Sequence, residues 1–75
     1  MKRYKSLEAD TGVTGYETGR DYIRVRFKNR AIYRYTYAST GANKIEAMKR
    51  LAEQGDGLTT FINQHVREAY ESKER

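Results

Sequence analysis

The sequence YIRVRFKNRAIYRYTY, residues 22–37, decides the fold of this chain. Apolar and polar side chains alternate over Tyr22–Phe27 and again over Ala31–Tyr37, and both stretches are rich in β-branched and aromatic residues. This pattern is typical of strands that bury one face only. The three residues between them, Lys28–Arg30, fit a tight turn. We therefore predict a β-hairpin over residues 21–37.

The length of the hairpin loop decides which side chains face the core. A two-residue loop would bury Arg34 beside Ile23 and Val25, and burying an unpaired guanidinium costs several kcal/mol. A three-residue loop buries no charge, so we predict this register, although it places Arg30 in the left-handed region at a cost of about 1 kcal/mol. The predicted core face is Ile23, Val25, Phe27, Tyr33 and Tyr35, and the predicted outward face is Tyr22, Arg24, Arg26, Arg34 and Thr36.

The segments around the hairpin complete a small α+β domain. A third strand over residues 12–16 would support the hairpin, because two strands alone are marginal in water. Residues 1–9 show no periodicity, and we expect a flexible arm there. After Tyr37 the spacing becomes helical: one helix begins near residues 39–41 and ends at Gly55, and a second begins at residues 56–57. The stripe of the second helix is Leu58, Phe61, Ile62, Val66, Ala69 and Tyr70.

We thus predict one domain over residues 10–72, an antiparallel meander of two to three strands followed by two helices packed on one face. The chain has 75 residues, no Cys and one His, which argues against disulfides and a structural metal as staples. No apolar run is long enough to span a membrane, and no apolar segment follows the basic first residues as in a signal peptide. We expect no membrane partner and a cytoplasmic location.

The positive charge is concentrated in the hairpin. The formal net charge is +5, and residues 20–34 contain six basic residues and one acidic residue, so the rest of the chain sums to zero. Arginines on neighbouring strands could bind phosphates, and Tyr22 could stack on an unpaired base. The alternative is a solvated sheet face that is charged to prevent aggregation. The candidate nucleic-acid-binding residues are Tyr22, Arg24, Arg26, Lys28, Arg30 and Arg34.

Catalysis has few candidate residues. His65 is the only imidazole, and we expect it to be a half-buried packing residue beside the apolar stripe. His65 and Glu68 have the i,i+3 spacing of two metal ligands, but no second pair exists. We therefore predict no catalytic residue, no cofactor, no metal and no enzymatic activity.

Two motifs resemble a known family. The hairpin pattern Phe27-x-Asn29-x-x-x-Tyr33-x-Tyr35 is followed by Gly57-Leu58-x-x-Phe61-Ile62-Asn63-x-x-Val66-Arg67-x-x-Tyr70. Together they resemble the KTSC domain, a module named for the C-terminus of some lysyl-tRNA synthetases and also found as small bacterial and phage proteins. The resemblance covers roughly residues 12–70 and implies a hairpin followed by helices, with a suggested RNA-binding role. Arg30 stands where the family commonly has a turn glycine, and Ala38-Ser39-Thr40-Gly41 replaces its usual Val-Pro.

Within this resemblance, Asn63, Arg67 and Tyr70 share one face of the second helix. They could form a polar site near the hydroxyl of Tyr35. Alternatively, Asn63 and Arg67 hydrogen-bond to loop backbone and attach the helix to the sheet.

These observations predict a small non-enzymatic binding domain for RNA or single-stranded nucleic acid. The alternative is a protein-interaction module, such as a small phage-type inhibitor that binds an acidic host protein with the same arginines. The chain could be a monomer, or a homodimer formed by an exposed apolar remainder of the first helix at Ile45, Met48 and Leu51.

Overall fold

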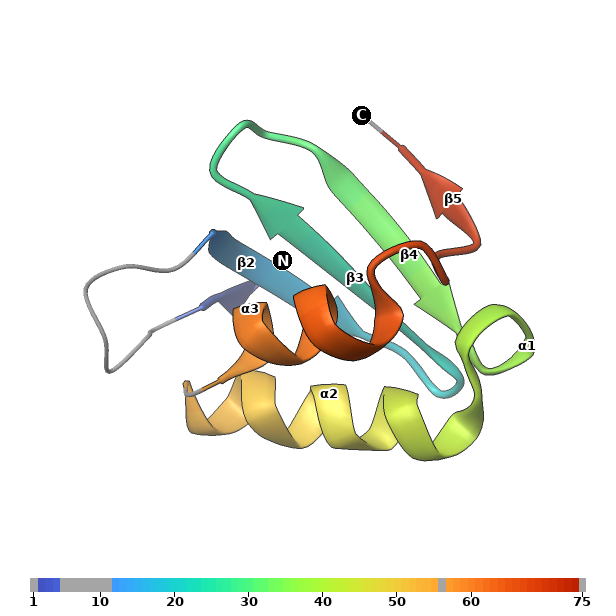
Figure 1. Cartoon of the computed structure of the whole chain (residues 1–75). Coiled ribbons are helices and arrows are strands. Elements are labelled where there is room, and N and C mark those ends of the chain that lie inside the picture. The colour runs from blue at the N-terminus through green and yellow to red at the C-terminus, as the bar shows by residue number, and fades with distance from the viewer. Residues whose placement is uncertain (1, 5–11, 56, 75) are drawn as a thin grey trace.

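The computed structural model describes residues 2–4, 12–55 and 57–74. Five strands form one antiparallel sheet in the order β1-β2-β3-β4-β5. The helices α2 and α3 and the π-helix η1 cover one face of this sheet, which confirms the predicted α+β class (Figure 1). The elements are β1 (Lys2–Arg3), β2 (Val13–Thr18), β3 (Tyr22–Phe27), β4 (Ile32–Thr36), α1 (Tyr37–Thr40), α2 (Ala42–Gln54), α3 (Leu58–Phe61), η1 (Ile62–Val66) and β5 (Ser72–Lys73).

The sheet is wider than predicted, because two to three strands are too few. The additional strands, β1 and β5, have two residues each and lie at the two edges of the sheet. A two-residue strand is too short to display an alternating pattern in the sequence. The flexible arm expected over residues 1–9 is also wrong for residues 2–4, since Tyr4 is 6% exposed and belongs to the core. Residues 1 and 5–9 lie outside the described part of the chain.

The β3–β4 hairpin has the predicted three-residue loop. Arg24 pairs with Arg34 and Val25 with Tyr33, so odd residues face odd residues. The amide of Phe27 donates to the carbonyl of Ala31 at 2.9 Å and closes the loop. Arg30 has φ +70°, in the left-handed region that this loop requires.

The faces of the hairpin follow this register with one exception. Ile23 and Val25 are fully buried, and Tyr35 is 1% exposed. Thr36, predicted to face outward, is instead 7% exposed because it caps α1. Its hydroxyl accepts a hydrogen bond from the Ser39 amide at 3.0 Å, while the Ser39 hydroxyl accepts one from the Thr36 amide at 3.1 Å. This capping box starts the first helical segment at Tyr37, earlier than predicted.

The helical region also departs from two continuous helices. Gly41, at φ +107°, separates α1 from α2, whereas Gly55 ends α2 in the left-handed region as predicted. The second helix changes from α3 into η1 and ends at Val66, so Ala69 and Tyr70 lie beyond it. The chain turns there to pair with β4.

Backbone hydrogen bonds show why the chain leaves the helix. The amide of Glu71 donates to the carbonyl of Arg34 at 2.6 Å, and the amide of Glu74 donates to that of Ile32 at 2.7 Å. These bonds satisfy edge groups of β4 that a longer helix would have left unpaired.

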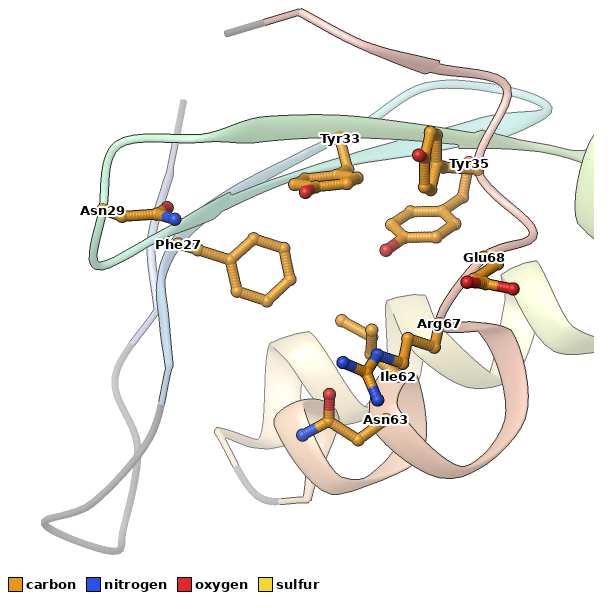
Figure 2. A pocket seen from close by; sticks show the side chains of 9 residues that line it. Phe27, Asn29, Tyr33, Tyr35, Ile62, Asn63, Arg67 and Glu68 are labelled. Carbon is orange, nitrogen blue, oxygen red and sulfur yellow. The ribbon is translucent and has the colours of Figure 1, made fainter.

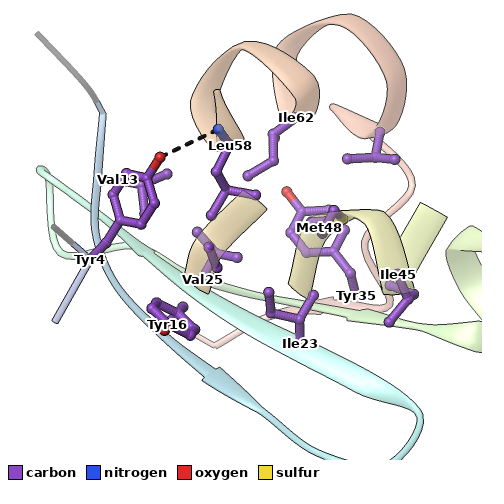
Figure 3. Close-up of a cluster of buried hydrophobic side chains, with 12 residues drawn as sticks. Tyr4, Val13, Tyr16, Ile23, Val25, Tyr35, Ile45, Met48, Leu58 and Ile62 are labelled. Carbon is purple, nitrogen blue, oxygen red and sulfur yellow. Dashed lines mark hydrogen bonds between the residues drawn. The ribbon is translucent and has the colours of Figure 1, made fainter. Parts of the chain in front are cut away.

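The core lies between the sheet and α2, α3 and η1 (Figure 3). At its edge, the hydroxyl of Tyr4 accepts a hydrogen bond from the amide of Leu58 at 3.4 Å. Ile45 and Met48 of α2 are fully buried within the chain, and the half-buried Leu51 packs against them. The exposed apolar remainder expected to form a homodimer is therefore absent from the described part of α2. Among the described residues there is also no helix with the length and apolar character needed to cross a membrane.

Candidate functional site

Arg24, one of the predicted phosphate ligands, is already held by two carboxylates on the outward face of the sheet. Its Nε and Nη2 donate to Glu74 at 3.0 and 2.7 Å, and its Nη1 donates to Glu17 at 3.0 Å. Hydrogen bonding to Glu74 and Glu17 raises the pKa of Arg24 further above its ordinary value. The same bonds lower the pKa of each carboxyl below 4.5. Arg24 is therefore a bridge between β2, β3 and the C-terminal segment.

The side chains of Arg34 and Tyr22 pack against each other. The guanidinium carbon of Arg34 lies 4.2 Å from the centre of the Tyr22 ring, which is a cation–π contact. Nε of Arg34 also lies 3.4 Å from a carboxylate oxygen of Glu71. The Tyr22 ring packs so closely on Gly19 that a Cβ there would overlap it. A base could use the ring face covered by Arg34 only after displacing Arg34, so the structure does not present Tyr22 as the open stacking surface we expected.

The other predicted cations lie around the hairpin loop. Arg26, Lys28 and Arg30, which we name the tip cations, line a pocket of about 380 Å³ together with Thr14, Phe27 and Ile32. Among the described residues, no carboxylate lines this pocket. Arg26 donates from Nε to the Thr14 hydroxyl at 3.2 Å, and neither Arg26 nor Arg30 forms an ion pair with a described residue.

Arg3 is a further cation that the sequence did not identify. In the sheet register Arg3 pairs with Gly15, which pairs with Arg26, so both arginines belong to the outward face. Gly15 lies between Arg3 and Arg26 and has no side chain that would separate their guanidinium groups. Only the pairing of β1 with β2 places Arg3 here, because residues 1–9 carry no periodic signal of a strand.

A second pocket lies on the inner side of the same hairpin, facing η1 (Figure 2). We name it the tyrosine pocket, and its volume is about 330 Å³. It contains all four residues of the polar site implied by the family resemblance, although Tyr70 reaches it from beyond η1 and not from a helix. Its lining residues are Phe27, Asn29, Tyr33, Tyr35, Ile62, Asn63, Arg67, Glu68 and Tyr70.

Aromatic contacts hold the walls of the tyrosine pocket in place. The ring of Tyr33 packs edge-to-face against Phe27 at 5.4 Å and against Tyr70 at 4.8 Å between ring centres. Tyr35 packs edge-to-face on Tyr70 at 6.4 Å. Burial, with Tyr33 and Tyr70 beside it, raises the pKa of Tyr35, so its hydroxyl is a hydrogen-bond donor at neutral pH.

The polar side of the tyrosine pocket comes from η1 and the turn after it. Asn63 and Arg67 are exposed, and neither side chain hydrogen-bonds to a described residue. The alternative in which they attach the helix to loop backbone is therefore not supported in the described part of the chain. Asn29 and Glu68 were not assigned to a site from the sequence, although Asn29 lies within the hairpin motif of the family resemblance.

His65 does not take the half-buried position expected for it. It is exposed, and its ring centre lies 4.8 Å from that of Phe61. Among residues 2–4, 12–55 and 57–74, no three metal-ligating side chains of His, Cys, Asp or Glu are grouped.

Comparison of the chain with models of protein families, with curated proteins and with solved structures finds no match. The resemblance to the KTSC domain therefore stays a prediction. The candidate site rests on the two pockets on either side of the hairpin loop.

Proposed function

We propose that this protein is a small non-enzymatic domain that binds single-stranded nucleic acid, RNA in particular, at the tip of the β3–β4 hairpin. One observation carries the proposal. Arg26 and Arg30 form no ion pair with a described residue and line a pocket whose described lining includes no carboxylate, whereas Arg24 on β3 and Arg34 on β4 are engaged by acidic residues.

The arrangement suits a negatively charged backbone. Lysine and arginine side chains that neutralise phosphates release condensed counterions, and this release drives binding to nucleic acids. Arg3 extends the basic surface across β2 on the outward side. The charge is thus available along a path from β1 to the hairpin loop, not at a single point.

The rings beside the tip favour a single strand over a duplex. Phe27 lines both pockets, so a strand that crosses the loop meets cations on one side and aromatic rings on the other. Single-stranded RNA is commonly recognised through unstacked bases on aromatic side chains. The resemblance to the KTSC domain implies the same class of ligand.

The test measures binding of a labelled oligouridylate by fluorescence anisotropy at several salt concentrations. Affinity should fall steeply with salt, and Arg26→Gln and Arg30→Gln should each reduce the log–log slope by about 0.7, the value per phosphate for single strands. Arg50→Gln is the matched control, because Arg50 is exposed on α2 and lines neither pocket. This control should leave the slope nearly unchanged.

Two results would contradict the proposal. One is a loss of slope in Arg50→Gln as large as in Arg26→Gln, which would indicate a general charge effect. The other is equal or tighter binding of a poly-glutamate peptide of the same charge, which would favour an acidic protein partner.

A further inference from the structure

The tyrosine pocket holds hydrogen-bonding groups that the fold itself does not use. Tyr35 is 1% exposed, yet its hydroxyl has no hydrogen bond to a described residue. In Figure 2 this hydroxyl and the guanidinium of Arg67 point into the same space, below the ring of Tyr33. Both groups line the pocket and are open to it: Arg67 is exposed, and among the described side chains only Nε of Arg34 is a fully buried polar atom without a hydrogen bond. A ligand that supplies acceptors would satisfy both donors.

We propose that the tyrosine pocket binds one unpaired guanine base of the strand that the tip cations hold, an inference that rests on the proposed function. The walls favour a planar aromatic group. Phe27, Tyr33 and Tyr70 form a chain of edge-to-face contacts, so the position of each ring is set before a ligand arrives. Such rings are surfaces on which bases stack.

The two opposite charges in the tyrosine pocket disfavour ligands that carry a net charge. Arg67 opposes an organic cation, which an aromatic cage alone would accept. Glu68 opposes a simple phosphate or carboxylate in the same space. A neutral group that offers acceptors beside donors fits both side chains.

Guanine offers this combination with O6 and N7 on one edge and its amino group on another, whereas cytosine carries its acceptors and its amino group on a single edge. The O6 and N7 of guanine are neighbouring acceptors that match the planar fork of Arg67. Its amino group can donate a hydrogen bond to the Glu68 carboxylate. Asn29 adds a donor, because its amino group forms no hydrogen bond to a described residue while its Oδ1 accepts one from the Ala31 amide at 3.0 Å.

The local helix geometry agrees with a binding role. Asn63 belongs to η1, and Arg67 is the first residue after the end of η1. Short π-helical turns are rare and occur frequently at functional sites. Here the π-helix presents Asn63 and Arg67 to the pocket while Ile62 and Val66 stay in the core.

The experiment compares short oligouridylates in which the central nucleotide is guanosine, adenosine or abasic. The unmodified protein should bind the guanosine form about thirtyfold or more tighter than the abasic form, at an equal salt slope. Tyr35→Phe, which keeps the ring, and Arg67→Gln should each reduce this preference by about tenfold. Arg26→Gln should weaken all three oligonucleotides equally, and Arg50→Gln should change none.

The outcomes separate this inference from the proposed function. Salt-dependent binding with equal affinity for the guanosine and abasic forms would overturn the base pocket and leave the tip site standing. Equal affinity for adenosine, or a full preference in both pocket variants, would overturn it as well.

If no oligonucleotide binds, the proposed function fails and the pocket is examined with guanosine monophosphate alone. Saturable amide shifts in residues 62–68 by NMR, lost in Tyr35→Phe, would support the base pocket. No shift at millimolar nucleotide would overturn it.

Discussion

Replacing Arg30 with glycine should stabilise the fold and weaken nucleic-acid binding at the same time. Arg30 has φ +70°, a conformation that costs an L-residue about 1–2 kcal/mol and costs glycine almost nothing. Glycine loses more backbone entropy on folding, by about 0.5–1 kcal/mol, which offsets part of the gain. The Arg30 side chain is exposed and bonds to no described residue, so its removal takes little from the folded state. The expected net stabilisation is about 0.5–1 kcal/mol.

The assay is a urea titration followed by tyrosine fluorescence, since the chain has seven Tyr and no Trp. With a slope near 1 kcal/mol per molar urea, the midpoint should rise by about 0.5–1 M. The salt slope of oligouridylate binding should fall by about 0.7 in the same variant. Arg30→Lys is the control that keeps both the charge and the backbone strain, and it should leave both quantities close to their original values.

A lower urea midpoint in Arg30→Gly would refute the strained turn. An unchanged salt slope in Arg30→Gly, beside a reduced slope in Arg26→Gln, would remove Arg30 from the site without removing the site. Arg30→Asn separates the two effects further, because asparagine tolerates the left-handed region better than arginine and carries no charge.

Three further predictions concern the rest of the fold. Arg24 lowers the pKa of Glu74, so their pairing stabilises the protein above pH 4.5, and this stabilisation is lost as the pH falls through the lowered pKa. The urea midpoint should therefore drop in acid. The drop should be smaller in Glu74→Gln, which has no carboxyl group to titrate at this position. Gly19→Ala should cost about 0.5–1 kcal/mol in thermal denaturation, because its Cβ displaces the Tyr22 ring from its cation–π contact with Arg34, and Tyr22→Ala should remove this penalty. Tyr35→Ala should cost about 3–5 kcal/mol by circular dichroism melting, and near-native stability would refute its place in the core.

The hairpin and its loop were predictable because their information is local. The alternation in residues 22–37 defines two strands, and one charged residue, Arg34, excludes the register that would bury it. The same argument required a left-handed Arg30, which the structure contains. Gly55 ended a helix for an equally local reason, since its φ of +72° suits glycine.

The candidate site was predictable only in part. The tip cations followed from the concentration of charge, and four of the nine residues that line the tyrosine pocket belong to the polar site that the family resemblance implied. One expected phosphate ligand, Arg24, forms an ion pair with Glu74, 50 residues away. No periodicity in the sequence reports which acidic residue will reach a given arginine.

The features that the sequence determines by itself depend on interactions over a few residues, whereas the features that only the tertiary structure determines depend on contacts between distant segments. Side-chain alternation, helix-ending glycines and the cost of burying a charge act over a few residues, and they specify the hairpin, its outward arginines and the α+β order of elements. The edge strands β1 and β5, the π-helix and the placement of Tyr35 and Arg67 in one pocket depend on segments distant in the chain. Two-residue strands and a helix end are marginal by themselves, so backbone pairing and packing against an assembled core determine where they form.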